Sequence, residues 1–197
     1  KYILELLGRE KPDYIAVAFD PPGGTFRNKM YPEYKANRKE TPQLVIDSLE
    51  PLMELCKAMN ITTLMLKGFE ADDVIGSMAK RCAGEGLDVY MVTPDKDYGQ
   101  LIEPHIWQYK PGKAGNDNEI IGVKEICDKY GIKTPSQVID MLTICGDTAD
   151  NVPGVKGVGE VGAGKLVAKY GSVEEIYKHL DELTPRQKSQ FEEAKDH

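Results

Sequence analysis

The chain has 197 residues, 41% of them hydrophobic and 29% charged, which is typical of a globular protein and excludes disordered and fibrous classes. No apolar run approaches the about 18 residues of a membrane span, and the charged start KYILELLGREK lacks the apolar core of a signal peptide. We therefore expect a cytoplasmic protein with no membrane partner. The four cysteines (Cys56, Cys82, Cys127 and Cys145) form no CxxC pair, which predicts reduced thiols and no zinc site.

The formal net charge of −7 argues at first against a polyanionic partner, because nucleic-acid binding depends on lysine and arginine. One segment departs from this balance, since residues 26–39 hold five basic side chains and only one acid, interleaved with aromatic rings. The basic residues are Arg27, Lys29, Lys35, Arg38 and Lys39, the rings Phe26, Tyr31 and Tyr34, and the acid Glu33. By itself the segment is equally consistent with a solvated basic loop and with a nucleic-acid contact.

The first half of the chain alternates helical and strand-like patterns. The first ten residues have helical spacing, and apolar runs at 13–20, 61–66 and 87–93 are rich in strand formers. Helices are predicted at 43–60 and 71–86. The first of these places an apolar face on Val45, Leu49, Leu52, Met53, Cys56 and Met59. The alternation predicts an α/β fold with a parallel sheet and right-handed crossovers.

After about residue 120 the strand signal fades and helices are predicted. Their ranges are 122–130, 135–145, 160–170, 172–183 and 185–195, and Ser172 with Glu175 has the spacing of a capping box. We therefore divide the chain into an α/β half, residues 1–133, and a helical half, residues 134–197.

Carboxylates follow each predicted strand of the first half. They are Asp20, then Glu70, Asp72 and Asp73, then Asp95 and Asp97; Asp147 and Asp150 follow the 135–145 helix. In an open parallel sheet, side chains that follow the strands gather at one edge. So many like charges need a counter-charge, and a divalent metal is the simplest one.

Oxygen ligands without histidine or cysteine favour Mg²⁺ or Mn²⁺ over zinc. Two such ions a few ångströms apart can support phosphodiester hydrolysis. The alternative is that these acids are solvated loop residues and helix caps; Asp72 and Asp73, for example, would stabilise a helix N-terminus.

The stretch GVKGVGEVGAGKL, residues 154–166, resembles the phosphate-binding loop of a nucleotide hydrolase. That loop needs a buried strand before it and Ser or Thr after its lysine, whereas DNVPGVKG precedes this one and Leu166 follows Lys165. The stretch instead predicts a turn at Gly157-Val158-Gly159 that enters a helix and can hold an anion on free backbone N–H groups. Close packing of two helices through glycine is a compatible alternative.

Five segments in this order carry a resemblance to a known family: VAFD, FRNKMYPEYKANR, GFEADDVIG, VTPDKDYGQL and GDTADNVPGVKGVG. From about residue 10 to its end, the chain resembles the 5′ nuclease domains of bacterial DNA polymerases I, in the flap endonuclease superfamily. The resemblance implies a PIN-like core with a mostly parallel sheet flanked by helices and a basic arch near residues 24–42. It also implies a helical DNA-binding subdomain with a helix-hairpin-helix at 151–170.

The resemblance further implies a metal-dependent, structure-specific 5′ nuclease that acts in DNA replication and repair. Its substrates would be 5′ flaps, nicked or gapped duplexes and RNA primers paired with DNA. It would act as a monomer, with a polymerase domain in the same native chain.

Site residues implied by the resemblance fall into three groups. Asp20, Glu70, Asp72 and Asp73 would form one metal cluster, and Asp95, Asp97, Asp147 and Asp150 the other, holding Mg²⁺ or Mn²⁺. Tyr34, Lys35 and Arg38 would meet the scissile phosphate, with Arg27 contacting the strand nearby. Lys156, Gly157, Gly159 and Lys165 would hold a duplex phosphate, with K⁺ bound to backbone carbonyls of the turn.

The sequence departs from the family pattern in two places. The family opens with a strand that ends in an aspartate of the first metal cluster, and no such strand precedes Lys1, so we expect a fragment. Val161-Gly162 stands where the family has lysine and a small hydroxyl residue, and a glycine costs up to about 1 kcal/mol in a helix. A catalytically silent DNA-binding fragment is therefore an alternative, and a P-loop nucleotide hydrolase a more remote one.

Overall fold

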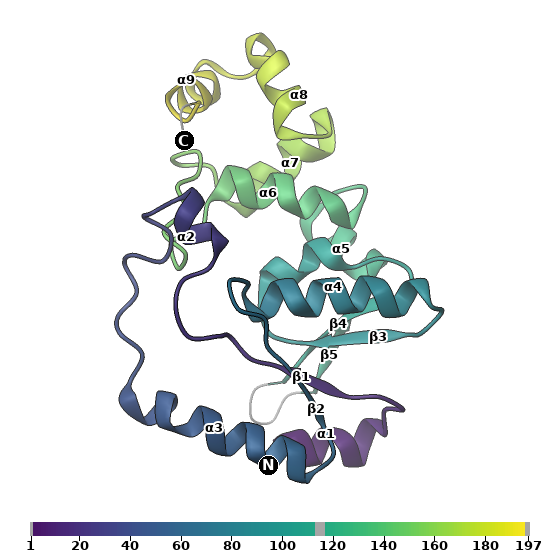
Figure 1. The fold of residues 1–197 in the computed structure, drawn as a ribbon. Helices are drawn as coiled ribbons and strands as arrows, with labels where there is room; N and C mark the ends of the chain where they lie inside the picture. The colour runs from purple at the N-terminus through teal and green to yellow at the C-terminus, as the bar shows by residue number, and fades with distance from the viewer. Residues whose placement is uncertain (1, 113–116, 196–197) are drawn as a thin grey trace. The chain divides into compact units, whose positions relative to one another are not determined.

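The computed structural model (Figure 1) describes residues 2–112 and 117–195. The chain divides into two compact units. Unit 1 comprises residues 1–26 and 39–74, and unit 2 comprises residues 27–38 and 75–197.

Unit 1 is built on a two-stranded parallel sheet. Strand β1 (Ala16–Ala18) pairs with β2 (Thr62–Leu64), and Val17 lies opposite Thr63. The helices of this unit are α1 (Tyr2–Glu10) and α3 (Gln43–Ala58), and α4 (Ala71–Gly84) begins here and continues into unit 2.

Helix α3 uses only part of its predicted apolar face. Cys56 is buried and Leu49, Met53 and Met59 are half-buried, but Val45 is 50% exposed and Leu52 is 45% exposed. The predicted face was therefore wrong at these last two positions. Only the side of the helix that carries Cys56 packs against the unit, so the periodicity overstated the width of the buried stripe.

Unit 2 contains a three-stranded mixed sheet. Strand β3 (Val89–Val92) runs parallel to β4 (Ile106–Lys110), which runs antiparallel to β5 (Glu119–Ile121). The α/β class is confirmed, although the strands form two sheets and one pair is antiparallel. The chain between Lys110 and Glu119 is too short for a crossover helix, which explains the antiparallel pairing. A small core of Ala79, Met91, Tyr98 and Ile106 joins α4 to this sheet.

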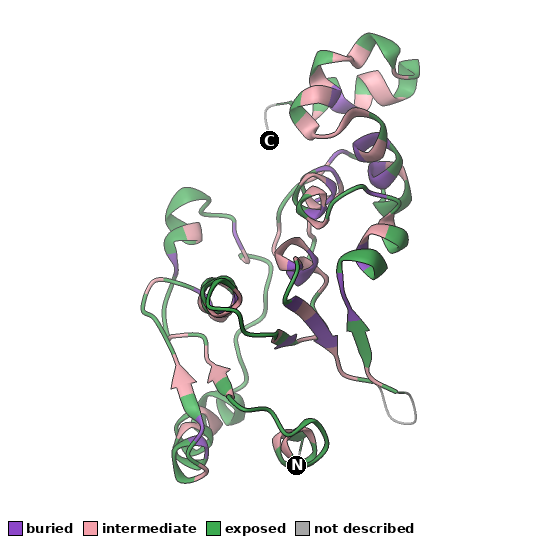
Figure 2. Cartoon of the chain, turned by 90° about the vertical axis from the view of Figure 1, so that its right-hand side faces the viewer, coloured by how far each residue is buried: buried purple, intermediate pink, exposed green. Residues whose placement is uncertain are grey.

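The C-terminal part of unit 2 is helical, as predicted. Its elements are α5 (Val123–Tyr130), η2 (Pro135–Gln137), α6 (Val138–Cys145), α7 (Glu160–Tyr170), α8 (Val173–Lys178), η3 (Leu180–Glu182) and α9 (Pro185–Glu193). The Ser172 hydroxyl accepts a hydrogen bond from the Glu175 amide, as its capping position predicted. The main core lies among these helices, around Phe191, Ile176, Val167 and Ile144, and Figure 2 shows buried positions concentrated here and in the unit 2 sheet.

Glycine permits close helix packing at one point in this core. A Cβ atom on Gly164 of α7 would overlap the carbonyl oxygen of Tyr130 at the end of α5. Part of the glycine-rich stretch therefore serves helix packing, as the alternative interpretation held. In the described part of the chain, no helix combines the length and the apolar character needed to cross a membrane.

Candidate functional site

A tight turn, residues 147–152, presents two of the predicted metal ligands; we call it the acid turn. Helix α6 ends at Cys145, and its C-cap is Gly146, whose φ of +67° and ψ of 180° suit glycine alone. The Asp147 amide donates to the Val152 carbonyl at 2.9 Å, and the Val152 amide donates to the Asp147 carbonyl at 2.8 Å. The Asp147 carboxylate also accepts hydrogen bonds from the amides of Ala149 and Asp150, at 2.7 and 3.2 Å. The turn is thus folded around the Asp147 side chain.

A second loop, after β3, presents Asp95 and Asp97. The Asp95 carboxylate accepts a hydrogen bond from the Asp97 amide at 3.0 Å and thereby caps η1 (Lys96–Leu101). Gln108 of β4, only 2% exposed, donates to the carbonyls of Thr93 and Asp95, at 3.1 and 2.6 Å. These bonds fix the direction in which the loop leaves the sheet.

Asp97 lies in an electrostatically unfavourable position. Its Oδ1 atom is buried and accepts no hydrogen bond from the described residues. Burial, and then repulsion from Asp95 and Asp147, raises the pKa of Asp97 to about 6. The two carboxylate pairs of unit 2 therefore lie close enough to interact, as the sequence predicted for this group.

Lys96 balances part of this negative charge. Its Nζ atom lies 3.4 Å from Asp147 Oδ2. Burial opposes ionisation of Asp147, but the amides of Asp150 and Ala149, together with Lys96, outweigh it and lower the pKa of Asp147. Burial likewise opposes the charge on Lys96, yet the Asp147 carboxylate raises the pKa of Lys96. Both groups are therefore charged at neutral pH.

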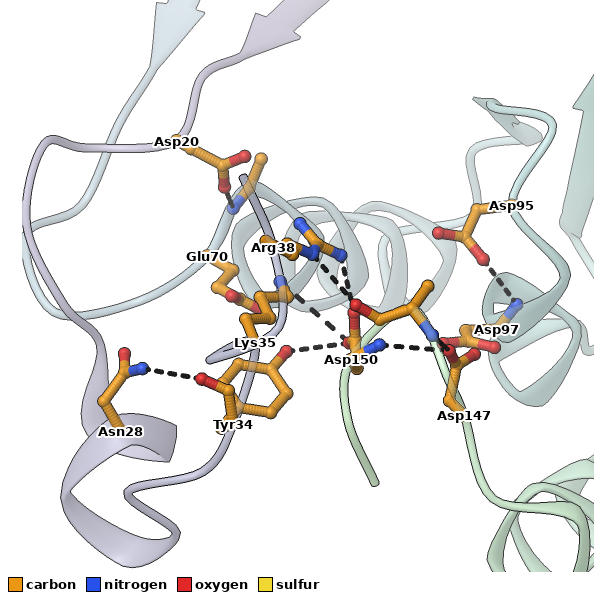
Figure 3. A network of polar contacts seen from close by, with 12 residues as sticks. Asp20, Asn28, Tyr34, Lys35, Arg38, Glu70, Asp95, Asp97, Asp147 and Asp150 are labelled. Carbon is orange, nitrogen blue, oxygen red and sulfur yellow. Dashed lines mark hydrogen bonds and ion pairs between the residues drawn. The ribbon is translucent and has the colours of Figure 1, made fainter. Parts of the chain in front are cut away.

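The predicted phosphate-binding residues contact Asp150 (Figure 3). The Tyr34 hydroxyl donates to Asp150 Oδ2 at 3.0 Å, and Arg38 Nη2 lies 2.5 Å from Oδ1. Lys35 Nζ lies 4.0 Å from Oδ2. Tyr34 is buried, with 8% of its surface exposed, so its ring is packed here rather than open for stacking on a base.

The predicted metal ligands of unit 1 lie around the start of α4. Asp20 Oδ1 accepts a hydrogen bond from the Ala71 amide at 2.7 Å, and Asp73 Oδ2 accepts one from the Glu70 amide at 2.9 Å. Glu70 is buried and Asp72 is exposed. Asp73 thus caps the helix, as the alternative to metal binding predicted, and Asp20, which that alternative did not single out, does the same.

The donor atoms of the described carboxylates determine which metal ion the site fits. Within residues 2–112 and 117–195, no group of three or more His, Cys, Asp or Glu side chains has the arrangement to hold a metal ion. The unit 2 donors are nevertheless carboxylate oxygens alone, and the buried Asp97 Oδ1 has no protein partner among them. Such a donor set fits a hard divalent cation.

The glycine-rich stretch turns at Lys156-Gly157, slightly before the predicted Gly157-Val158-Gly159, and leads into α7 as predicted. Gly157 has a φ of +81°, and Gly159 is the N-cap of the helix. Lys156 and Lys165 are both exposed, and the Lys156 carbonyl accepts a hydrogen bond from Gln190 of α9 at 2.9 Å. Cys145, Pro153 and residues 154–159 line an open pocket of about 610 Å³ at this turn. Residues 146–159 contain no strand, and Leu166 is buried, so the structure gives a P-loop no support.

Arg27 lies on the short helix α2 (Phe26–Met30) and is half-buried. Three further residues that the sequence analysis did not assign to the site also shape it: Lys96, Gln108 and Asn151. Lys96 stands between two aspartates in PDKD, a pattern that could have indicated its role. Gln108 interrupts the strand-forming run IWQYK, an anomaly that buried polar groups often produce. Asn151 gives no such signal.

Two family models together match nearly the whole chain. The 5′-3′ exonuclease, N-terminal resolvase-like domain matches residues 1–131, and the 5′-3′ exonuclease, C-terminal SAM fold matches residues 133–197. DNA polymerase I of Caldicellulosiruptor bescii is 41% identical over 198 residues, which cover 98% of this chain and 23% of the polymerase. DNA polymerase I of Bacillus subtilis is 37% identical over 195 residues, which cover 98% and 22%. The chain thus spans about a fifth of the length of these curated relatives.

Solved structures share the fold. T5 5′-exonuclease with bound divalent metal ions (zinc) superimposes with a TM-score of 0.79 at 22% identity, covering 99% of this chain and 74% of that one. The catalytic core of Rad2 in complex with DNA substrate gives a TM-score of 0.59 at 18% identity, covering 88% and 55%. The resemblance and the fold class read from the sequence are confirmed, and the chain belongs to the 5′-3′ exonuclease family.

Proposed function

We propose that this chain is a divalent-metal-dependent 5′ nuclease that hydrolyses phosphodiester bonds at 5′ flaps and at nicked or gapped ends of DNA. The proposal is carried by a buried oxygen of Asp97 that has no hydrogen-bond partner among the described residues. It lies close to the acid turn, where Lys35 and Arg38 pair with Asp150. Carboxylates that can bind a metal ion and basic side chains that can bind a phosphate therefore lie at the same place. Membership of the 5′-3′ exonuclease family supports the same activity.

The unit 2 carboxylates Asp95, Asp97, Asp147 and Asp150 would hold one divalent ion, and Asp20, Glu70, Asp72 and Asp73 of unit 1 would hold another. Mg²⁺ and Mn²⁺ suit these oxygen donors. Once bound, such ions supply Lewis-acid stabilisation for attack of water on a phosphodiester. Divalent ions in the T5 5′-exonuclease structure support this assignment.

The basic side chains then hold the substrate phosphate. Arg38 and Lys35 would move from Asp150 to the reacting phosphate and stabilise the charge that develops there. Tyr34, whose hydroxyl contacts Asp150, would orient that carboxylate. Arg27 would contact the strand nearby.

Duplex DNA would be held by the glycine-rich turn. Lys156, Gly157, Gly159 and Lys165 offer exposed positive charge and backbone N–H groups at the start of α7. K⁺ at the carbonyls of the turn belongs to the same proposal. The Rad2 core solved with a DNA substrate supports DNA as the partner.

In this proposal, residues 1–133 form the nuclease core and residues 134–197 the DNA-binding subdomain. The two matched family domains meet between residues 131 and 133, which supports the division. A polymerase domain in the same native chain is supported by the relatives' names, and a monomer is the proposed active form.

A catalytically silent DNA-binding fragment is the second candidate. It is favoured by the cations Lys96, Lys35 and Arg38, which lie on the carboxylates that a metal would need. Cleavage of a 5′-labelled flap across a titration of Mg²⁺ and Mn²⁺, with flap binding measured in parallel, separates the two. The nuclease predicts metal-dependent cleavage; intact binding without cleavage at any concentration would leave only the binding module.

A further inference from the structure

Two segments far apart in the chain join at the acid turn, and both lie in unit 2. We call residues 27–38 the basic segment. The Lys35 amide donates to the Asp150 carbonyl at 2.9 Å, and Asn37 Nδ2 donates to the Thr148 carbonyl at 2.7 Å. These bonds anchor the basic segment on the backbone of the turn, in addition to the ionic contacts of its side chains.

Asn151 makes a bond in the opposite direction. Its Nδ2 atom donates to the Glu33 carbonyl at 2.8 Å, so a side chain of the acid turn also binds the backbone of the basic segment. The side chain is half-buried and uncharged. Because both partners are neutral, the bond does not depend on the charge of Asp150 or on metal binding.

This neutrality distinguishes Asn151 from the ionic contacts. Neither Lys35 nor Arg38 can hold a substrate phosphate while it is paired with Asp150. The proposed reaction therefore requires the two side chains to leave the carboxylate. When they leave, the ionic part of the docking is lost. The bonds made by the side chains of Asn151 and Asn37 and by the Lys35 backbone amide remain and keep the segment in place.

Backbone geometry at Asn151 supports a specific role. Its φ is +58°, a left-handed conformation that asparagine adopts more readily than most residues other than glycine. Lys35, on the facing segment, also has a φ of +58°. Two left-handed residues therefore meet where the segments join, and such conformations persist only where the surroundings hold them.

We propose that Asn151 is a positioning residue: its side-chain amide holds the basic segment on the acid turn whatever the charge state of the site. Lys35 and Arg38 thereby stay within reach of a phosphate beside Asp150. The catalytic part of this inference rests on the proposed nuclease function, whereas the docking part stands without it.

The test replaces Asn151 by glycine, which keeps the left-handed backbone and removes only the amide. Asn60→Gly is the matched control, because Asn60 has a φ of +57° and its side chain makes no hydrogen bond with the described residues. Hydrogen exchange of the metal-free proteins measures the docking. We expect exchange in residues 27–38 to be about 3- to 10-fold faster in Asn151→Gly, with α7 unchanged and Asn60→Gly like the parent.

Single-turnover cleavage of a 5′ flap with Mg²⁺ measures the positioning. We expect Asn151→Gly to lower the cleavage rate constant about 10-fold with less than about a 2-fold change in flap affinity, since the phosphate groups are misplaced rather than lost. A variant that merely destabilised the fold would instead lose affinity and would show faster exchange in α7.

Unchanged exchange in residues 27–38 would overturn the proposal, and so would faster exchange with an unchanged cleavage rate. If the parent cleaves no flap, the nuclease function fails, and the exchange result alone decides whether Asn151 docks the segment. Should Asn151→Gly not fold, Asn151→Asp keeps the side-chain shape, faces Glu33 with an acceptor instead of a donor, and must show the same faster exchange.

Discussion

Arg38 contacts Asp150 with Nη2 2.5 Å from Oδ1, although 112 positions separate the two residues in the sequence. The pair brings together a guanidinium that can bind a phosphate and a carboxylate that can bind a metal ion. Arg38 is half-exposed, so its guanidinium can turn from the carboxylate to a ligand without unfolding the segment.

Replacing Arg38 by alanine is expected to lower the rate of flap cleavage about 100- to 1000-fold, because charge that develops on the phosphate loses a preorganised partner. Binding of duplex DNA should change little. Arg81→Ala is the control, since Arg81 forms an exposed ion pair with Glu85, directly after the end of α4. Equal cleavage rates for the two variants would remove Arg38 from the catalytic machinery.

Asp97 gives the metal-free protein a distinct pH dependence. Its pKa is raised from 3.8 to about 6, so the folded state keeps a proton that the unfolded state has already lost. The stability that this proton confers is full below about pH 4 and is lost as the pH rises through about 6. The metal-free protein is therefore expected to become less stable across this window.

The Asp97→Asn substitution is expected to remove this loss of stability between about pH 4 and pH 6. A shift of about two pKa units corresponds to at most about 3 kcal/mol, which solvent screening reduces to about 1 to 2 kcal/mol. Urea unfolding without metal should show the variant more stable than the parent at pH 7.5 and similar at pH 4. Asp128→Asn, on an exposed ion pair of α5, should show no such difference. A parent whose stability rises between pH 4 and 6 relative to Asp97→Asn would contradict the account.

Lys96 is expected to compete with metal for Asp147. Lys96→Gln removes the ammonium 3.4 Å from that carboxylate, so the Mg²⁺ concentration that gives half-maximal thermal stabilisation should fall about 3- to 10-fold. Lys124→Gln, which breaks an exposed pair with Asp128, should leave it unchanged. A higher Mg²⁺ requirement in Lys96→Gln would show that the lysine assists metal binding.

The glycine-rich turn can be tested separately from the acid cluster. A Cβ atom on Gly157 would lie 2.8 Å from Gln190 Nε2 and would displace the bond that Gln190 makes to Lys156. Gly157→Ala is therefore expected to weaken binding of duplex DNA about 10-fold, measured by fluorescence anisotropy. Gly131→Ala carries similar backbone strain, with a φ of +67° and open space around it, and should leave affinity unchanged. Equal losses in both would point to general destabilisation.

Much of the site could be predicted because it depends on local patterns. The strand pattern placed Asp95 and Asp97 directly after β3, whereas their grouping with Asp147, which follows helix α6, came from the family resemblance and agrees with the repulsion that Asp97 feels from Asp147. Strands β4 and β5 were missed because β5 is short and because the polar Gln108 interrupts the apolar run of β4. The packing of helices around Gly164 is one of two interpretations that the sequence allows, because a glycine pattern does not distinguish a turn from a close approach of two helices.

The contact between Asn151 and Glu33 was not predictable. It depends on a left-handed backbone at Asn151 and on the path of a segment 118 residues earlier, and neither leaves a periodic pattern in the sequence. Burial of Tyr34 was missed likewise, because its neighbours in sequence are polar and its partner, Asp150, is remote.

Cleavage of a 5′-labelled flap by the parent and by Asp97→Asn, at matched Mg²⁺ concentrations and with flap affinity measured on the same samples, tests the central claim most directly. The account predicts cleavage by the parent that rises with Mg²⁺, and a loss of at least about 100-fold in Asp97→Asn with flap affinity retained. Equal cleavage by the two proteins, or none by the parent at any Mg²⁺ concentration, would contradict it.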